Sequence, residues 1–322
     1  MSKIFNFENL ELSDRNGIYG GTSCKKEGVI IDNEYWLIKY PQDVRNNNTL
    51  DVSYTTSPLS EYIGSQIYKI LGFDVHETAL GIRHGRVVVA CKDFCEFPGE
   101  LREIRTLKNI YDENLKNDLE LDKILDFAEN GSSHIIQLKE LLAHFKYNPV
   151  LAKVVGVEGR FWNCLVVDAL INNNERNIDD WGLILKNGSY ELAPIFDNGS
   201  SFFNKLSDEQ IEKLINNRDE FEKKSLNIIT SYGDKHNHFD FKYFLLQENL
   251  IGLDKSIKKL VPIIVERFSK IERLINDIPE EYNGISICSS VRKRFYIECM
   301  KLRINEVFVP TYKKLNDEKY YE

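Results

Sequence analysis

The most constraining feature of the sequence is the stretch 171–202, which places acidic residues on either side of a short turn. Asn187 and Gly188 separate two short runs of strand-forming residues, 181–185 and 190–194. An Asn-Gly pair between such runs is the strongest local signal for a β-hairpin. Because a hairpin brings the outer ends of its strands together, the residues that flank it are predicted to lie at one end.

Carboxylates occupy both of these flanks. Glu175, Asp179 and Asp180 precede the first strand, and Asp197 follows the second. Like charges in a small volume repel unless a cation neutralises them, and hard oxygen ligands in this number suit Mg²⁺. The stretch therefore predicts a divalent-metal site; the alternative is a charged surface loop in which residues 197–199 only form a bend. The order of acid, hairpin and second acid is also the order used by protein kinases.

Composition and charge limit the class of protein. The chain has 322 residues, of which 42% are hydrophobic, so it can bury a core large enough for two lobes. A formal net charge of −8 argues against a direct nucleic-acid partner, since phosphate binding normally needs a basic face. The first residues lack a signal-peptide pattern and no run approaches about 18 apolar residues, so we expect a cytoplasmic protein without a membrane partner.

The six cysteines are spread over strand and helix patterns without a Cys-x-x-Cys pair. This spacing predicts neither a disulfide framework nor a zinc site, and we expect reduced, mostly buried thiols. His236 and His238 have a spacing that metal ligands can use, but they lie in a polar, loop-like segment, so we assign them to no site.

A glycine-rich segment opens the first predicted hairpin. Residues 17–26 read GIYGGTSCKK and precede two strand-like runs. The backbone N–H groups at Gly20 and Gly21, with the hydroxyls of Thr22 and Ser23, would be available to phosphate oxygens of a nucleotide. The pattern matches neither of the common phosphate-loop motifs, so an ordinary turn is the alternative.

Two charged residues stand in otherwise apolar elements. Lys39 lies in the strand-like run YWLIKYP, where a lysine either reaches the surface or meets a buried anion such as an ATP phosphate. Residues 57–72 predict a helix with Ser57 as N-cap, Pro58 at the first position and a terminating glycine. Its apolar stripe omits Glu61, which either favours the helix dipole or pairs with Lys39, as in kinases.

The chain changes character near residue 95. A further hairpin ends in RVVVACKDF, where backbone groups of Lys92, Asp93 and Phe94 would face an adenine ring if this is an interlobe hinge. The later patterns are mainly helical, including ELREIRTLKNIY and FWNCLVVDALI, and the second is apolar almost all round, which predicts a central buried helix. We therefore predict an α+β fold with a β-rich lobe over 1–95 and a helical lobe over 96–322.

Taken together, these segments resemble the HipA-like serine/threonine kinases, in particular the compact cell-translocating kinase A type. The resemblance runs from about 17 to about 204 and is carried by YGGTSCKK, YWLIKYP, SEYIGSQIYKILGF, ETALG, VVACKDF and WGLILKNGSYELAPIFDNGSS. It implies a two-lobed protein-kinase-like fold in which Lys39 holds the ATP phosphates and Glu61 orients Lys39. Residues 92–94 would serve adenine, and Asp197 matches the metal-binding Asp of the family's DNG or DCG motif.

The loop before the hairpin departs from the family pattern at three positions. The family usually reads N-x-D-R-H-x-x-N-W-G, whereas this chain reads NNERNIDDWG. Glu175 stands for the catalytic Asp, Asn177 for the His and Asp180 for the metal-binding Asn. Glutamate is one methylene longer but still accepts a hydroxyl proton, and Asp180 remains a Mg²⁺ ligand with an added negative charge.

The resemblance implies an ATP- and Mg²⁺-dependent kinase acting on serine or threonine of a protein, with Glu175 as hydroxyl-orienting base and Asp180 and Asp197 as metal ligands. It also implies that the protein is a bacterial toxin or effector with an antitoxin or regulatory partner. An effector of this kind could be delivered to another cell. Thr22 and Ser23 are candidates for autophosphorylation. The alternatives are a pseudokinase that binds nucleotide or a partner, and a kinase-like enzyme that transfers AMP or modifies a lipid or small molecule.

Overall fold

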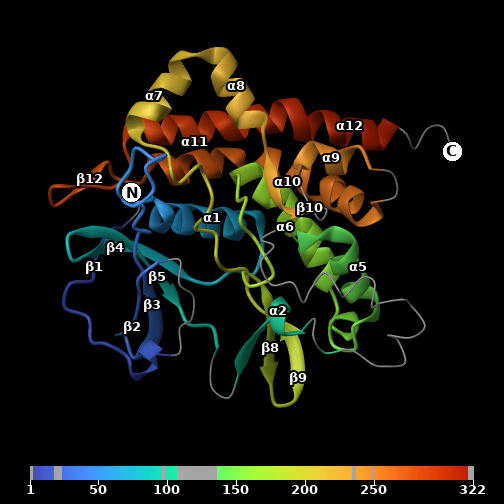
Figure 1. Ribbon diagram of the computed structural model, residues 1–322, viewed down its shortest axis with the longest axis horizontal. Coiled ribbons are helices and arrows are strands. Elements are labelled where there is room, and N and C mark those ends of the chain that lie inside the picture. The colour runs from blue at the N-terminus through green and yellow to red at the C-terminus, as the bar shows by residue number, and fades with distance from the viewer. Residues whose placement is uncertain are drawn as a thin grey trace.

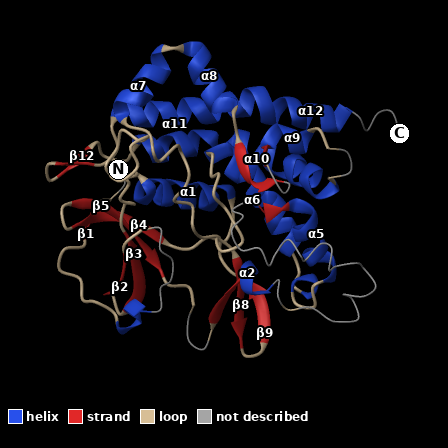
Figure 2. Ribbon diagram, viewed as in Figure 1, coloured by secondary structure: helices blue, strands red, loops and turns tan. Residues whose placement is uncertain are grey.

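Strands dominate the N-terminal part of the chain and helices dominate the remainder (Figures 1 and 2). The computed structural model describes residues 3–17, 24–95, 99–107, 110, 136–233, 237–247 and 250–317. Helix α1 (Ser57–Leu71) lies between the sheet of the N-terminal part and the long helices of the C-terminal part (Figure 1). This mixed arrangement confirms the predicted α+β class.

The strands of the described residues form four sheets. The main sheet has the order β1-β4-β5-β3-β2, and the smaller ones are β6-β8-β9, β11-β10-β7 and β12-β13. The strand bounds are β1 Phe5–Asn6, β2 Lys26–Ile31, β3 Glu34–Lys39, β4 Thr78–Arg83, β5 Arg86–Lys92, β6 Glu100–Glu103, β7 Ile136–Gln137, β8 Gly182–Lys186, β9 Ser189–Leu192, β10 Ile229–Gly233, β11 His238–Asp240, β12 Glu281–Tyr282 and β13 Ile285–Ser286.

Helices build most of the chain after residue 136. A π-helical turn, Ile304–Phe308, joins the last two of them, and 3₁₀ turns occur at Asp14–Gly17 and Leu151–Lys153. Besides α1, the helix bounds are α2 Ile104–Leu107, α5 Leu138–Tyr147, α6 Val157–Ile171, α7 Asp208–Asn216, α8 Arg218–Leu226, α9 Phe241–Leu245, α10 Ile251–Asn276, α11 Ser290–Arg303 and α12 Val309–Asp317.

Lys39 lies on an interior strand of the main sheet. Its backbone pairs with Val89 on β5 and with Lys26 on β2, so β3 is not an edge strand. The neighbouring hairpin of β4 and β5 turns at His84 and Gly85, where φ is 51° and 68°. The alternative of an edge-strand lysine is therefore excluded, and Lys39 ends a strand that is paired on both sides.

The hairpin predicted around Asn187 and Gly188 is present. β8 pairs antiparallel with β9, and Lys186 lies opposite Ser189. Both turn residues have positive φ, 51° and 77°, which is what a two-residue type I′ turn requires. The turn chemistry of two adjacent residues was sufficient to predict this element.

The segment 100–107 differs from the helix predicted for it. Residues Glu100–Glu103 form β6, antiparallel to β8, and helix α2 follows directly. Backbone groups along β8 need partners, and this tertiary pairing overrides the helical preference of the segment. The close approach depends on Gly182, because a Cβ there would lie 2.3 Å from the carbonyl oxygen of Arg102.

The start of α1 also differs from the prediction. Thr56, rather than Ser57, occupies the N-cap position, and neither side chain caps the helix. The Ser57 hydroxyl instead accepts a hydrogen bond from Thr55 Oγ1 at 2.9 Å, and the Thr56 N–H donates to the carbonyl of Asn204 at 2.8 Å. The predicted C-terminal stop is confirmed, with Gly72 in the left-handed region at φ 94°.

One apolar core joins α1 to the helical part of the chain. Ile63 and Ile67 of α1 are fully buried in the same cluster as Val166 of α6 and Ile264 of α10. The prediction that α6 is a central buried helix is confirmed by this packing. A separate small cluster, which includes Ile38, covers the other face of the main sheet. The boundary expected after residue 95 stays a prediction, because the core is shared by both proposed lobes.

The cysteines form no disulfide, and four of the six are buried: Cys91, Cys164, Cys288 and Cys299. Among the helices of the described residues, none combines the length and the apolar character needed to cross a bilayer.

Candidate active site

Lys39 bridges the two parts of the fold. Its Nζ donates to Glu61 Oε2 of α1 at 3.1 Å and to Asp197 Oδ1, just after β9, at 3.0 Å. Burial alone would lower the pKa of Lys39, but the charges of Asp197 and Glu61 more than offset this and raise the pKa well above its ordinary value. The lysine is therefore a fixed positive charge between two carboxylates, one on α1 and one in the segment after β9.

Glu61 is buried in the fold, although it lies off the apolar stripe predicted for its helix. Its side chain is 1% exposed. Oε1 accepts hydrogen bonds from His76 Nε2 and from the Asn198 N–H, each at 3.0 Å. Burial would raise the pKa of Glu61, but the charge of Lys39 and the hydrogen bond from His76 reverse this, so the pKa is lowered. Glu61 thus stays ionised and oriented toward Lys39.

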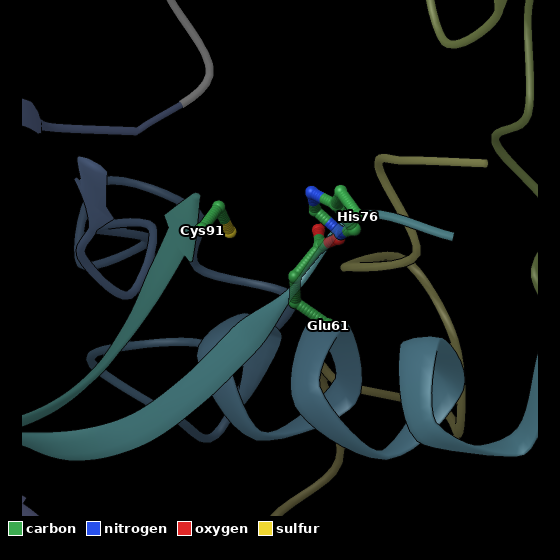
Figure 3. Close-up of side chains that lie close together, drawn as sticks. All are labelled: Glu61, His76 and Cys91. Atoms are coloured by element: carbon green, nitrogen blue, oxygen red, sulfur yellow. The ribbon is translucent and has the colours of Figure 1, made fainter. Parts of the chain in front are cut away.

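Glu61, His76 and Cys91 offer donor atoms that lie within 4.8 Å of one another (Figure 3). Cys91 comes from β5 and directs its sulfur toward the other two side chains. Burial raises the pKa of the Cys91 thiol, which keeps it protonated near neutral pH. Because both oxygens of Glu61 already accept hydrogen bonds, from Lys39 on one side and from His76 and Asn198 on the other, we interpret the group as a support for Glu61 rather than a metal site.

One of the four carboxylates predicted to lie together has a cationic partner that the sequence did not indicate. Asp179 forms a two-pronged ion pair with Arg105, with N–O distances of 2.5 and 2.7 Å. Neither the helix nor the loop pattern signalled this pair, since its partners are 74 residues apart. Glu175 and Asp180 each lie close enough to Asp197 for its charge to raise their pKa.

Asp180 and Asp197 have the electrostatics expected of a cation site. Asp180 accepts a hydrogen bond from the Asn177 N–H at 2.8 Å. Burial and the charge of Asp197 raise the pKa of Asp180 well above its ordinary value. A buried carboxylate next to a second carboxylate fits a divalent cation, which would relieve the repulsion and take oxygen ligands.

Glu175 lies at the more exposed side of the site, with 52% of its side chain accessible. Its oxygens accept hydrogen bonds from Ser200 Oγ at 2.6 Å and from Lys205 Nζ at 2.9 Å. Burial pushes its pKa up, but these two hydrogen bonds outweigh burial, and the net pKa is lowered. The carboxylate is therefore ionised near neutral pH and is reachable from solvent.

Arg176 organises the loop and was missed by the sequence analysis. Its guanidinium, 3% exposed, donates to Asp168 Oδ2 at 2.5 Å, to the carbonyl of Phe196 at 2.9 Å and to Asn198 Oδ1 at 2.5 Å. These bonds hold the residues on both sides of Asp197 against the loop that carries Glu175. A signal existed, because Asp168 is the one acidic residue in the apolar run 161–171 and a buried charge needs a partner.

The predicted adenine segment lies at the end of β5. The N–H groups of Lys92 and Asp93 donate to the carbonyls of Glu77 and Tyr35, each at 2.9 Å, so both are used within the sheet. The Phe94 ring packs beside that of Phe196 with centroids 5.5 Å apart, which brings the segment next to Asp197. Its contact with adenine stays a prediction.

The predicted phosphate-binding residues Gly20, Gly21, Thr22 and Ser23 lie outside the described residues. The described chain resumes at Cys24, and β2 begins opposite Lys39. Their role likewise stays a prediction.

In this site a strand lysine contacts a helix glutamate and an Asp that follows an acidic loop and a hairpin. This is the arrangement of residues found in protein-kinase-like phosphotransferases. Comparison with known proteins agrees with this class. The chain is 30% identical over 282 residues to the serine/threonine-protein kinase CtkA of Helicobacter pylori, covering 85% of this chain and 79% of the relative. It therefore belongs to the CtkA-type, HipA-like serine/threonine kinases, as the sequence resemblance indicated.

Solved structures have the same fold. The crystal structure of the proinflammatory kinase CtkA of Helicobacter pylori matches with a TM-score of 0.78 and 24% identity, covering 98% of this chain and 99% of that chain. HipA of the Shewanella oneidensis MR-1 toxin–antitoxin system, in complex with HipB and operator DNA, matches with a TM-score of 0.56 and 12% identity, over 93% and 68% of the two chains. No family profile matches the sequence.

Proposed function

We propose that the protein is an ATP- and Mg²⁺-dependent kinase that phosphorylates serine or threonine on a protein substrate. The observation that carries this proposal is the pair of contacts from Lys39 to Glu61 and Asp197, at 3.1 and 3.0 Å. A lysine fixed in this way presents its charge where the phosphates of a nucleotide would lie between strand and hairpin. Family membership supports the same reaction class.

The proposal gives each residue a role. Lys39 would bind the ATP phosphates, and Glu61 would keep its ammonium group in place. Asp180 and Asp197 would hold Mg²⁺, which supplies neutralisation of phosphate charge when bound. Glu175, ionised and accessible, would orient the acceptor hydroxyl and receive its proton.

Partners and regulation follow from the same family membership. A protein carrying serine or threonine is the substrate class that kinase homology supports, and Thr22 or Ser23 are the proposed autophosphorylation sites. The HipA structure contains HipB, so a regulatory or antitoxin partner is proposed for this chain as well. The net charge of −8 disfavours direct binding of nucleic acid. A cytoplasmic site of action, in the producing or in a recipient cell, completes the proposal.

A pseudokinase is the second candidate. The observation that favours it is the additional carboxylate at Asp180, whose pKa is raised by burial and by the charge of Asp197. When ionised, this additional carboxylate would repel ATP phosphates, so the site would bind nucleotide weakly and act as a partner-binding module. Mass analysis of any modified product also separates phosphoryl transfer from transfer of AMP.

The test is incubation with γ-labelled ATP and Mg²⁺, with label followed on the protein and on a generic serine/threonine substrate. We expect Glu175→Gln to lower the rate by about 10²–10⁴-fold, because the amide cannot take the hydroxyl proton. Glu191→Gln, an exposed position on β9, is the matched control and should keep the wild-type rate. No label in wild type despite measurable ATP binding would favour the pseudokinase.

A further inference from the structure

Two side chains from the segment after β9 meet the carboxylate of Glu175. Ser200 Oγ donates to Oε2 at 2.6 Å, and Lys205 Nζ donates to Oε1 at 2.9 Å. These partners lie 25 and 30 residues away in sequence, beyond the hairpin. Each carboxylate oxygen has a second lone-pair site, so Glu175 can still accept a hydrogen bond from an incoming hydroxyl.

Folding stability does not account for the ion pair of Lys205 with Glu175. The side chains are 43% and 52% exposed. Ion pairs this open to solvent contribute little to stability, because water screens them and two long side chains lose conformational freedom. The same exposure leaves the ammonium group accessible to a substrate.

The backbone around Lys205 is anchored on both sides. The carbonyl of Asn204 accepts from the Thr56 N–H at 2.8 Å, and the carbonyl of Leu206 accepts from Arg292 Nη2 at 2.9 Å. The segment is thus tied to the start of α1 and to α11. A side chain on such a support can be held in one place with little entropy lost when a substrate binds.

Lys205 adds positive charge to a site in which negative charge would accumulate during phosphoryl transfer. Lys39 is already shared between Glu61 and Asp197. A bound Mg²⁺ would keep Asp180 ionised, so this position would carry a negative charge where the family pattern has a neutral Asn, and a transferring phosphoryl group would add more. A cation beside Glu175 opposes this accumulation on the side where the acceptor hydroxyl would enter.

We propose that Lys205 is a catalytic residue that binds the transferring phosphoryl group, and that Ser200 helps to orient Glu175. The proposal rests on the proposed kinase function. In the step, the bond from the γ-phosphorus to the bridging oxygen breaks and its electron pair leaves with ADP. A bond from the acceptor hydroxyl oxygen to phosphorus forms, and the hydroxyl proton passes to Glu175. An ammonium group has three N–H donors, so Lys205 can hold Glu175 and an equatorial phosphoryl oxygen together.

The first test compares Lys205→Met, Lys205→Arg and wild type in the labelled-ATP assay. We expect Lys205→Met to lower kcat by about 10²-fold, the loss typical of one donor to a developing charge, with the KM for ATP changed less than about twofold. Lys205→Arg should recover most of the rate, since it keeps the charge. Lys213→Met removes the same charge from an exposed position on α7 and should leave kcat unchanged.

The second test does not depend on turnover. Wild type and Lys205→Met are titrated with ADP and Mg²⁺, with and without aluminium fluoride, which mimics the phosphoryl group in flight, and binding is followed by calorimetry. We expect equal affinity for ADP and at least about tenfold weaker trapping of the fluoride complex by the variant. A wild type that traps the complex but transfers no phosphoryl would count against the kinase function and not against Lys205. Equal trapping by both proteins would overturn the role of Lys205, whatever the turnover.

Discussion

Lys39 and Glu61 form an ion pair that is costly to bury and is retained at the centre of the fold. Removing two charges from water carries a desolvation cost that their attraction only partly offsets, so such a pair is weak evidence for stability. Here Glu61 receives additional hydrogen bonds from His76 and the Asn198 N–H. The hydrogen bonds compensate for burial and fix the geometry, as the phosphate-binding role proposed for Lys39 requires.

The ionised carboxylate of Glu27 on β2 is predicted to stabilise the fold in a pH-dependent way. Its carboxylate accepts from Tyr40 and Arg83, each at 2.8 Å, and pairs with Lys25 at 2.6 Å. Burial alone would raise its pKa, but these hydrogen bonds lower the pKa from 4.5 to about 2. The ionised form is favoured by folding, so its contribution is fully present above pH 4.5 and is lost as the pH falls toward about 2.

Glu27→Gln should therefore make the free energy of unfolding depend less on pH between 4.5 and about 2. Denaturant unfolding at several pH values measures this slope directly. A variant whose slope equals that of wild type would show that Glu27 titrates with the same pKa in the folded and unfolded chains.

At the scale of elements, α1 connects the two halves of the site. Its side chains reach Lys39 on one side, and on the other Ser60 donates to the carbonyl of Ser201 at 2.9 Å. Gly64 allows α1 to approach the segment after Asp197, because a Cβ there would lie 2.8 Å from Asn198 Cβ. The spacing between α1 and the segment that follows Asp197 is thus set by the absence of a side chain at Gly64.

Gly64→Ala should move α1 away from Asn198 and lower the rate of phosphoryl transfer by about tenfold or more, since misplacing a catalytic group by about 1 Å can cost about 10²-fold. The rate is measured in the labelled-ATP assay, with thermal unfolding alongside. Gly159→Ala in α6 is the matched control, because an added Cβ meets nothing within 4 Å. It should raise the free energy of unfolding by up to about 1 kcal/mol and leave the rate unchanged. Full activity in Gly64→Ala would contradict this role of α1.

Across the whole molecule, one hydrophobic core packs the main sheet, α1 and the helices α6 and α10 together. Local chemistry made much of this predictable: Asn187 and Gly188 specify a hairpin turn, and the apolar run 161–171 specifies a buried helix. Long-range pairing was not predictable in the same way. β6 depends on the edge of β8, and Asp179 turns toward Arg105, which is 74 residues away.

In the candidate site, too, local sequence patterns identified some residues, and only the fold identified others. Lys39, Glu61 and Asp197 could be singled out because each stands in a recognisable local pattern, and the structure brings the three together. Lys205 stands in a stretch of mixed polar and apolar residues without such a pattern, and only the folded chain places it at Glu175. Residues whose role depends on contacts between distant segments have no local sequence pattern. A single sequence therefore does not identify them.

The most direct test of the account is the Mg²⁺-dependent transfer of γ-phosphoryl by wild type, Asp197→Asn and Asp179→Asn. The two variants remove the same charge, one from the group bound to Lys39 and the other from the group bound to Arg105. We predict that Asp197→Asn loses at least about 10²-fold in rate, as removal of a key electrostatic group does, whereas Asp179→Asn stays within a few-fold of wild type. Equal rates in Asp197→Asn and wild type, or an ATP-binding wild type that transfers no phosphoryl, would contradict the account.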